Sequence, residues 1–287
     1  MKKICVVTGS RAEYGLLKKL ISRLDKEKSL LMQIIVTGAH LSEFYGNTYK
    51  NIIDDGFKIS KKIYIPIKKN NSKYDTTKFT GNAIIGFVDA YKKLDPDIIV
   101  VLGDRYEIFA ATFSAMNMNI PVAHIHGGEK TLGSNDENMR HSITKMSKWH
   151  FVSTKEYKKR VIQLGEIPKN VHLVGALAYE AIKSEILYSK KLFEKETNLK
   201  LRKNNFLITF HPETSSNNFE MNTFENMINA VKKVKNSTII FTLSNADAQG
   251  GEINKKIIEF NKKNKAHSIF FYSMGQKLYY SALKHCN

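Results

Sequence analysis

The residues best suited to acid–base chemistry follow two apolar runs in the middle of the sequence, Ile98–Leu102 and Ile120–Ile125. Each run is typical of a buried strand and ends abruptly, in Gly103, Asp104 and Arg105 after the first and in His126, Gly127, Gly128 and Glu129 after the second. Ligands of open parallel sheets bind beyond the carboxyl ends of the strands. The two strand ends therefore predict one site that holds two acids, an arginine and a histidine.

A second polar group follows the glycine turn, in the order Asp136, Glu137, Arg140 and His141. We expect it to open a helix capped by Asn135 or Ser134, because short polar side chains favour that position. Acids in a first helical turn also complement the helix dipole. Asp136 and Glu137 are therefore open to two interpretations, one catalytic and one limited to stabilising the helix.

The segment TGSRAEYG follows the apolar run 3–7 and occupies the position at which an α/β unit can bind phosphate. Backbone N–H groups at a helix start attract anions, and Arg11 stands where a diphosphate could be bound. The segment matches neither the G-x-G-x-x-G fingerprint of dinucleotide-binding proteins nor a Walker loop. The alternative interpretation is a capped helix that carries a surface arginine.

Strand and helix patterns alternate along the chain, which indicates an α/β fold with parallel sheets. The expected strands are 3–7, 31–36, 58–65, 98–102, 120–125, 151–153 and 171–174, followed by 206–210, 237–243 and 268–272. The expected helices include 42–54, 83–94, 108–118, 155–164, 176–187 and 275–284, and the polar stretch 68–78 is expected to be an exposed loop. His40, just past the second strand, is more easily explained as structural than as functional.

The pattern divides into two Rossmann-like domains, 1–187 and 188–287, connected through the lysine-rich stretch 185–203. The second domain has three expected strands, and the sequence stops after a helix, where a further strand is due. We therefore expect the second domain to be incomplete relative to its architecture.

The net charge of +18 raises the hypothesis of nucleic-acid binding. Arginine, on which base recognition most depends, makes up only six of the 45 basic residues, so a solvated lysine-rich surface is the better interpretation. No apolar run approaches the roughly 18 residues of a membrane span. Cys5 and Cys286 have no metal-ligand spacing and form no disulfide framework, so we expect a cytoplasmic protein without a metal or cofactor.

Six motifs run in order through the whole chain: TGSRAEYG, GDRYE, HIHGGE, NDENMRHSITKMSKWHFVSTKEYKKRVIQLGE, HPET and SNAD. Together they resemble the hydrolysing UDP-N-acetylglucosamine 2-epimerases, most nearly the bacterial enzymes of the sialic-acid pathway. The resemblance implies a glycosyltransferase-B fold with a UDP-sugar bound between two domains. It also implies release of UDP and N-acetylmannosamine, through elimination to a 2-acetamidoglucal and addition of water. A homo-oligomer is expected as well.

The resemblance also implies roles for individual residues. Arg11 matches an arginine that contacts the nucleotide diphosphate, and His211 matches a histidine near the phosphates. Asn245 occupies a position that contacts the nucleotide in relatives. Asp104 and Arg105 match the Asp-Arg pair at the catalytic strand end.

One departure from the family pattern concerns the second acid, because many relatives have glutamate where this chain has His126. Glu129 and Glu137 then become the better candidates for that acid, while we expect His126 and Arg140 to bind substrate. Removal of the C2 proton needs a placed base, for which Asp104 and Glu137 are candidates on different steps.

The anionic leaving group requires positive charge, which Arg11 and Arg105 would supply. His211 could donate a proton to the bridging oxygen or orient a phosphate. Two other functions stay open: a related epimerase that acts on UDP-diacetylbacillosamine, and an inactive fragment that binds nucleotide weakly or not at all.

Overall fold

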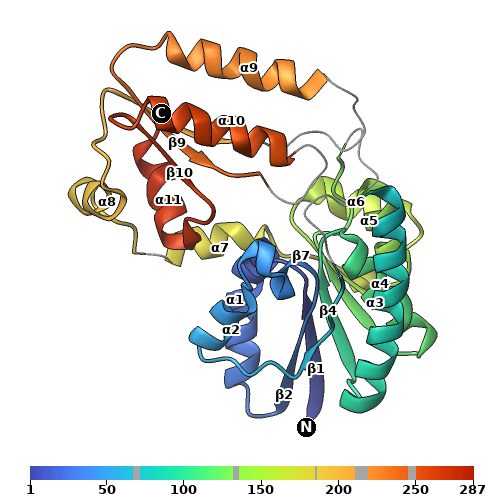
Figure 1. The fold of residues 1–287 in the computed structure, drawn as a ribbon. Helices are drawn as coiled ribbons and strands as arrows, with labels where there is room; N and C mark the ends of the chain where they lie inside the picture. The colour runs from blue at the N-terminus through green and yellow to red at the C-terminus, as the bar shows by residue number, and fades with distance from the viewer. Residues whose placement is uncertain (67–71, 132–135, 185, 211–218, 245–249) are drawn as a thin grey trace. The chain divides into compact units, whose positions relative to one another are not determined.

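The computed structural model describes residues 1–66, 72–131, 136–184, 186–210, 219–244 and 250–287. The chain forms two compact units, Met1–Ala181 and Ile182–Asn287. Each unit is a parallel sheet covered by helices (Figure 1), which confirms the predicted α/β class.

The first unit contains, among its described residues, a seven-stranded parallel sheet in the order β3-β2-β1-β4-β5-β6-β7. Its strands are β1 (Lys2–Thr8), β2 (Leu30–Val36), β3 (Lys61–Lys62), β4 (Ile98–Leu102), β5 (Val122–Ile125), β6 (Trp149–Val152) and β7 (Val171–Leu173). From β1 the chain adds β2 and β3 on one side of the sheet, and from β4 it adds β5, β6 and β7 on the other side. The carboxyl ends of β1 and β4 therefore flank the switch point at which open α/β sheets bind ligands.

Helices cover both faces of this sheet (Figure 1). They are α1 (Arg11–Lys26), α2 (Tyr49–Asp54), α3 (Lys73–Leu94), α4 (Tyr106–Asn117), α5 (Asp136–Lys145), α6 (Lys155–Gln163) and α7 (Leu177–Ser184). Successive residues of β4 enter two different cores. Ile99 and Val101 pack with α3 and α4, and Val100 and Leu102 pack with α1. A strand that is buried on both faces needs the continuous apolar run seen in the sequence.

Three predicted elements between β2 and β4 are wrong in extent. The expected strand 58–65 is reduced to β3 (Lys61–Lys62) at the edge of the sheet, with the N–H groups of Ser60 and Ile63 donating to β2 on either side of it. The expected helix 42–54 is a 3₁₀ turn (Glu43–Tyr45) followed by α2, because Gly46 and Asn47 adopt positive φ values of 82° and 49° and interrupt the helix.

The polar stretch expected to be a loop contains the first turns of α3. Ser72 caps this helix, since its Oγ accepts the Asp75 N–H (3.2 Å) while the Asp75 carboxylate accepts the Ser72 N–H (3.0 Å). Phe79 and Ala83 then bury one face of the helix in the core. A reciprocal cap of this kind satisfies two helix-end donors, which is why a polar sequence can begin a helix here.

The second unit contains, where the structure describes it, a three-stranded parallel sheet in the order β10-β9-β8. Its elements are α8 (Lys190–Thr197), β8 (Asn204–Thr209), α9 (Phe219–Lys232), β9 (Ser237–Thr242), α10 (Gly250–Lys263), β10 (Ser268–Phe271) and α11 (Gly275–His285). The predicted connection 185–203 is not a simple linker. It contains α8, whose Phe193 is fully buried beside Ile240 and Met274 in a core of this unit.

No helix among the described residues is both long enough and apolar enough to cross a membrane.

Candidate active site

The pairing of β4 with β5 brings the two predicted strand ends together. Leu102 lies opposite Ile125, and the N–H of Gly103 donates to the carbonyl of Ile125 at 3.1 Å. A buried histidine, His124, braces this edge, because its Nε2 lies 2.8 Å from the Gly103 carbonyl and its Nδ1 lies 3.1 Å from Oγ1 of Thr144. The side chains that follow Gly103 and Ile125 therefore start from neighbouring positions.

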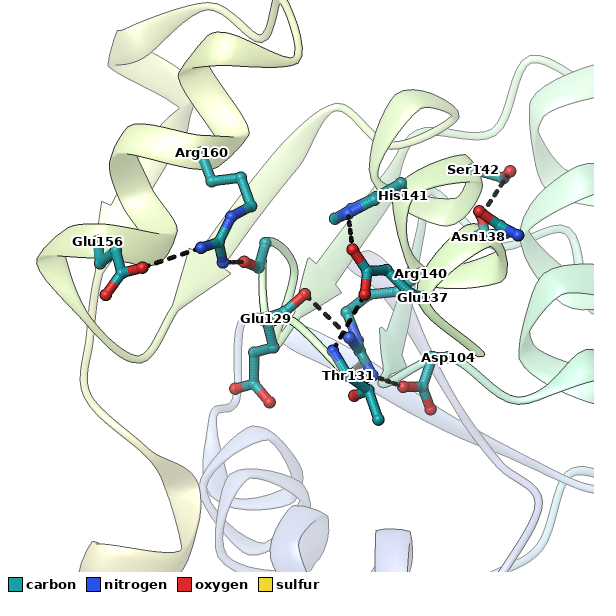
Figure 2. Close-up of polar contacts among 11 residues, drawn as sticks. Asp104, Glu129, Thr131, Glu137, Asn138, Arg140, His141, Ser142, Glu156 and Arg160 are labelled. Atoms are coloured by element: carbon teal, nitrogen blue, oxygen red, sulfur yellow. Dashed lines mark hydrogen bonds and ion pairs between the residues drawn. The ribbon is translucent and has the colours of Figure 1, made fainter. Parts of the chain in front are cut away.

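Asp104 is held by Arg140, which reaches back from α5. The guanidinium donates to the Asp104 carboxylate, to the Glu129 carbonyl (2.9 Å) and to Oγ1 of Thr131 (3.1 Å). Figure 2 shows Arg140 between Asp104 and the loop that carries Glu129 and Thr131. Burial raises the pKa of Asp104, although Arg140 partly opposes the shift. The result is a carboxyl group that is fixed in place and suited to accept a proton.

Glu137 lies in the first turn of α5 and faces the same loop. Its carboxylate accepts the Thr131 N–H at 3.3 Å and lies 3.6 Å from Nε2 of His141, one turn further along the helix (Figure 2). The contact with Thr131 holds the loop against the helix, whereas the contact with His141 lies within α5. The two interpretations of Glu137, catalytic and helix-stabilising, are compatible with this position.

The glycine turn after β5 holds His126 and Glu129 side by side. Nδ1 of His126 lies 3.3 Å from Oε1 of Glu129, and the same oxygen accepts the hydroxyl of Ser153 at 3.0 Å. Arg160 donates to the carbonyl of Gly128 and fixes the turn from α6. Burial lowers the pKa of His126, which favours the neutral imidazole.

Arg105 belongs to a neighbouring cluster of charges rather than to this network. Its Nε donates to the fully buried carboxylate of Glu107 at 2.8 Å, and this carboxylate raises the pKa of Arg105. Glu13 approaches from α1, where its Oε2 accepts the Gly9 N–H at 2.7 Å. Burial, together with the nearby Glu107, raises the pKa of Glu13 to about 8. A Cβ on Gly9 would lie 2.5 Å from Oε1 of Glu107, so only glycine fits there.

Arg11 is the first residue of α1, directly after the Ser10 cap. Burial lowers its pKa, and its guanidinium makes no hydrogen bond or ion pair to another described residue. Since β1 pairs with β4, the N-terminus of α1 opens at the edge that carries Asp104. This arrangement suits an anionic ligand. His40, in contrast, is buried between the hydroxyls of Thr8 (3.1 Å) and Thr48 (2.8 Å), as a structural residue would be.

The structure thus places Asp104, Arg140, Glu129, Glu137 and His126 at one edge of the sheet, linked through Thr131 or through direct contacts. The predicted positions His211 and Asn245 lie outside the described residues.

Sequence reasoning missed Glu13, Glu107, Thr131 and Ser153. Glu13 and Glu107 stand inside the motifs TGSRAEYG and GDRYE, so the motifs contained them although their burial was not foreseen. Among the described residues, no group of three or more histidine, cysteine, aspartate or glutamate side chains is placed to hold a metal ion.

Comparison with known proteins yields a family and a fold. A family model described as UDP-N-acetylglucosamine 2-epimerase matches residues 22–287. The GDP/UDP-N,N'-diacetylbacillosamine 2-epimerase (hydrolyzing) of Campylobacter jejuni is 42% identical over 283 residues, which cover 99% of this chain and 73% of that protein. Polysialic acid biosynthesis protein P7 of Escherichia coli is 42% identical over 266 residues, which cover 92% of this chain and 68% of that protein.

A solved structure shows the same fold. The crystal structure of UDP-GlcNAc 2-epimerase from Neisseria meningitidis bound to UDP-GlcNAc superposes with a TM-score of 0.79 at 20% identity and covers 99% of this chain and 76% of that one.

Proposed function

Because this chain belongs to the UDP-N-acetylglucosamine 2-epimerase family, we propose that it is a hydrolysing 2-epimerase of a UDP-activated 2-acetamido sugar. It releases UDP and yields the free sugar with the opposite configuration at C2. The observation that carries the proposal is the carboxyl group of Asp104, which is partly buried at the end of β4 and held there by Arg140.

The reaction begins with removal of a C2 proton that is not acidic, so it requires both a placed base and a departing anion. Asp104 takes this proton, the C2–H electron pair forms the C1=C2 double bond, and the C1–O bond breaks as UDP leaves. Placed general bases typically contribute about 10²–10⁴-fold to a rate. The raised pKa of Asp104 suits it to hold the proton until release.

Positive charge must meet the diphosphate as it departs. Arg11 and the N-terminus of α1 supply such charge, and Arg11 is not bound to another described side chain. Arg105 adds charge from the next strand end, where the buried Glu107 fixes its Nε. Preorganised cations of this kind stabilise the developing negative charge without reorganisation.

Two sugars are candidates for the substrate. UDP-N-acetylglucosamine, with N-acetylmannosamine as the product for sialic acid synthesis, agrees with the family description and with the E. coli relative named for polysialic acid biosynthesis. UDP-N,N'-diacetylbacillosamine is favoured by the name of the C. jejuni relative. Both sugars carry the 2-acetamido group and the UDP leaving group, so the same chemistry serves either.

The test is to incubate the 287-residue chain separately with each UDP-sugar and to quantify UDP and free sugar by chromatography. We expect equal amounts of UDP and of the 2-epimer from one of the two substrates. Asp104→Asn should lower the rate of UDP release about 10²–10⁴-fold. Absence of UDP release from both sugars would show that this chain is not a hydrolysing epimerase of either. Light scattering in the same buffer tests the expected homo-oligomer.

A further inference from the structure

The turn after β5 holds His126 in a backbone conformation that few residues other than glycine adopt. Its φ is +66°, and its N–H donates to the carbonyl of Phe151 at 3.0 Å. Two residues later, a Cβ on Gly128 would lie 2.6 Å from the carbonyl oxygen of Tyr157, so only glycine fits at that position of the turn. Non-glycine residues in this region cost of order 1–3 kcal/mol and concentrate at functional sites.

The imidazole of His126 is held through one nitrogen only. Nδ1 faces Oε1 of Glu129, which Ser153 also binds, whereas Nε2 is buried and has no hydrogen-bond partner among the described residues. A carboxylate can only accept hydrogen bonds, so its position 3.3 Å from Nδ1 favours the neutral tautomer that carries its proton on Nδ1. Nε2 is left with a lone pair that is ready to take a proton.

The two glutamates predicted as the second acid are both bound to protein groups. The Glu129 carboxylate is engaged by His126 and Ser153, and the Glu137 carboxylate accepts the Thr131 N–H and lies near His141. His126 is therefore the better candidate, because its basic Nε2 has no partner among the described residues.

Resting on the proposed function, we propose that His126 is the catalytic residue of the water-addition step and that Glu129 and Ser153 position it. Asp104 has by then taken the C2 proton, and UDP has left. The C1=C2 electron pair takes a proton at C2 as the water oxygen bonds to C1. Nε2 takes a proton from that water and passes a proton to C2 in the same step, so the imidazole begins and ends neutral. The proton on Asp104 passes to solvent, so the sum is UDP-sugar plus water giving sugar, UDP and one proton.

Burial of the ring and the charges around it set the pH dependence of this step. Glu129 and Asp104 raise the pKa of His126 and Arg140 lowers it, while a charge on His126 in turn lowers the pKa of the neighbouring His124. Burial is the largest influence and lowers the pKa. The neutral form that the step requires is therefore present at neutral pH, and activity should fall as pH drops and the ring becomes protonated.

The test separates the two half-reactions in His126→Gln. We expect UDP release in a single turnover close to the wild-type rate, accumulation of the 2-acetamidoglucal, and free-sugar formation slowed by about 10²-fold or more. His172→Gln, which replaces an exposed histidine on β7, should behave as wild type. Free sugar formed at the wild-type rate by His126→Gln would overturn the inference, and so would loss of UDP release in that variant. A wild type that releases no UDP would instead overturn the proposed function, and this inference with it.

Two further variants guard against a folding defect. His126→Gly removes the strain at φ +66°, and added imidazole should restore its free-sugar formation. Glu129→Gln removes a charge that raises the pKa of His126, so the acid limb of the pH–rate profile should move to lower pH. No rescue by imidazole together with an unmoved acid limb would contradict the assigned roles.

Discussion

The guanidinium of Arg140 donates a hydrogen bond to the carboxylate of Asp104, 36 positions earlier in the chain, although only 5% of Arg140 is exposed. The same guanidinium binds Glu129 and Thr131, so one side chain joins the ends of β4 and β5 to α5. The buried charged and titratable groups near this contact, and the tightly packed glycine beside Glu107, lead to four predictions.

Replacement of Arg140 by methionine should lower the free energy of unfolding by about 3 kcal/mol, because it leaves a partly buried carboxylate without its partner. Urea unfolding measures the loss. Arg23→Met is the matched control, since Arg23 pairs with Glu180 while 75% of its side chain is exposed. Such surface pairs contribute about 0–1 kcal/mol. Equal losses in the two variants would show that Arg140 is not a structural clamp.

Gly9→Ala should destabilise the first unit by about 1–3 kcal/mol, because the new Cβ would lie 2.5 Å from the buried Glu107 carboxylate. Gly81→Ala is the control, since Gly81 lies within α3 and a Cβ there meets no atom within 4 Å. The control should be stabilised by about 0.5–1 kcal/mol, because alanine favours helix more than glycine does. Thermal unfolding of both variants measures the difference, and a stabilised Gly9→Ala would contradict the contact.

Glu13 should make the protein less stable as the pH rises from about 4.3 to about 8. The pKa of Glu13 is raised in the folded state, so the folded protein binds the proton more tightly than the unfolded chain does. The stability that results from this difference is lost as the pH rises and the group ionises. The cost is at most about 1.4 kcal/mol per pH unit. Urea unfolding across this range should show a slope in wild type that is smaller in Glu13→Gln. Identical slopes would mean that Glu13 has no raised pKa.

His124 should make the protein less stable as the pH falls, which is the opposite of the effect of Glu13. Burial lowers its pKa to about 3, so it stabilises the fold above about 6.5 and that contribution is lost as pH falls toward 3. His40, whose pKa burial lowers to about 4, adds to the loss. His124→Gln should reduce the fall in unfolding free energy between pH 7 and pH 5, whereas His172→Gln should leave it unchanged. The prediction fails if both variants keep the wild-type slope.

The expected alternation of strands and helices is present, and the strands at the site lie where the sequence placed them. Ile98–Leu102 is a strand because five consecutive apolar residues suit burial on both faces. Val122–Ile125, which is apolar except for the buried His124, pairs with it in parallel. This adjacency is expected from local patterns, because two strands joined through a single helix commonly lie side by side in a parallel sheet. The adjacency of the two strands was enough to predict that Asp104 and His126 lie at the same edge of the sheet. Their roles in catalysis stay predictions.

The sequence by itself therefore determined the alternation of strands and helices, the parallel class of the sheets and the edge at which chemistry-bearing side chains gather. Only the tertiary structure decided which of those side chains are bound to one another. Glu107 reads as an ordinary acid of a first helical turn, yet it is fully buried against Arg105 and Gly9. The substrate-binding role of Arg140 stays a prediction, and only the structure shows that its guanidinium is engaged with protein acceptors. The physical reason is that apolar periodicity is local, whereas the burial and pairing of a charge depend on groups that only packing brings within a few ångströms.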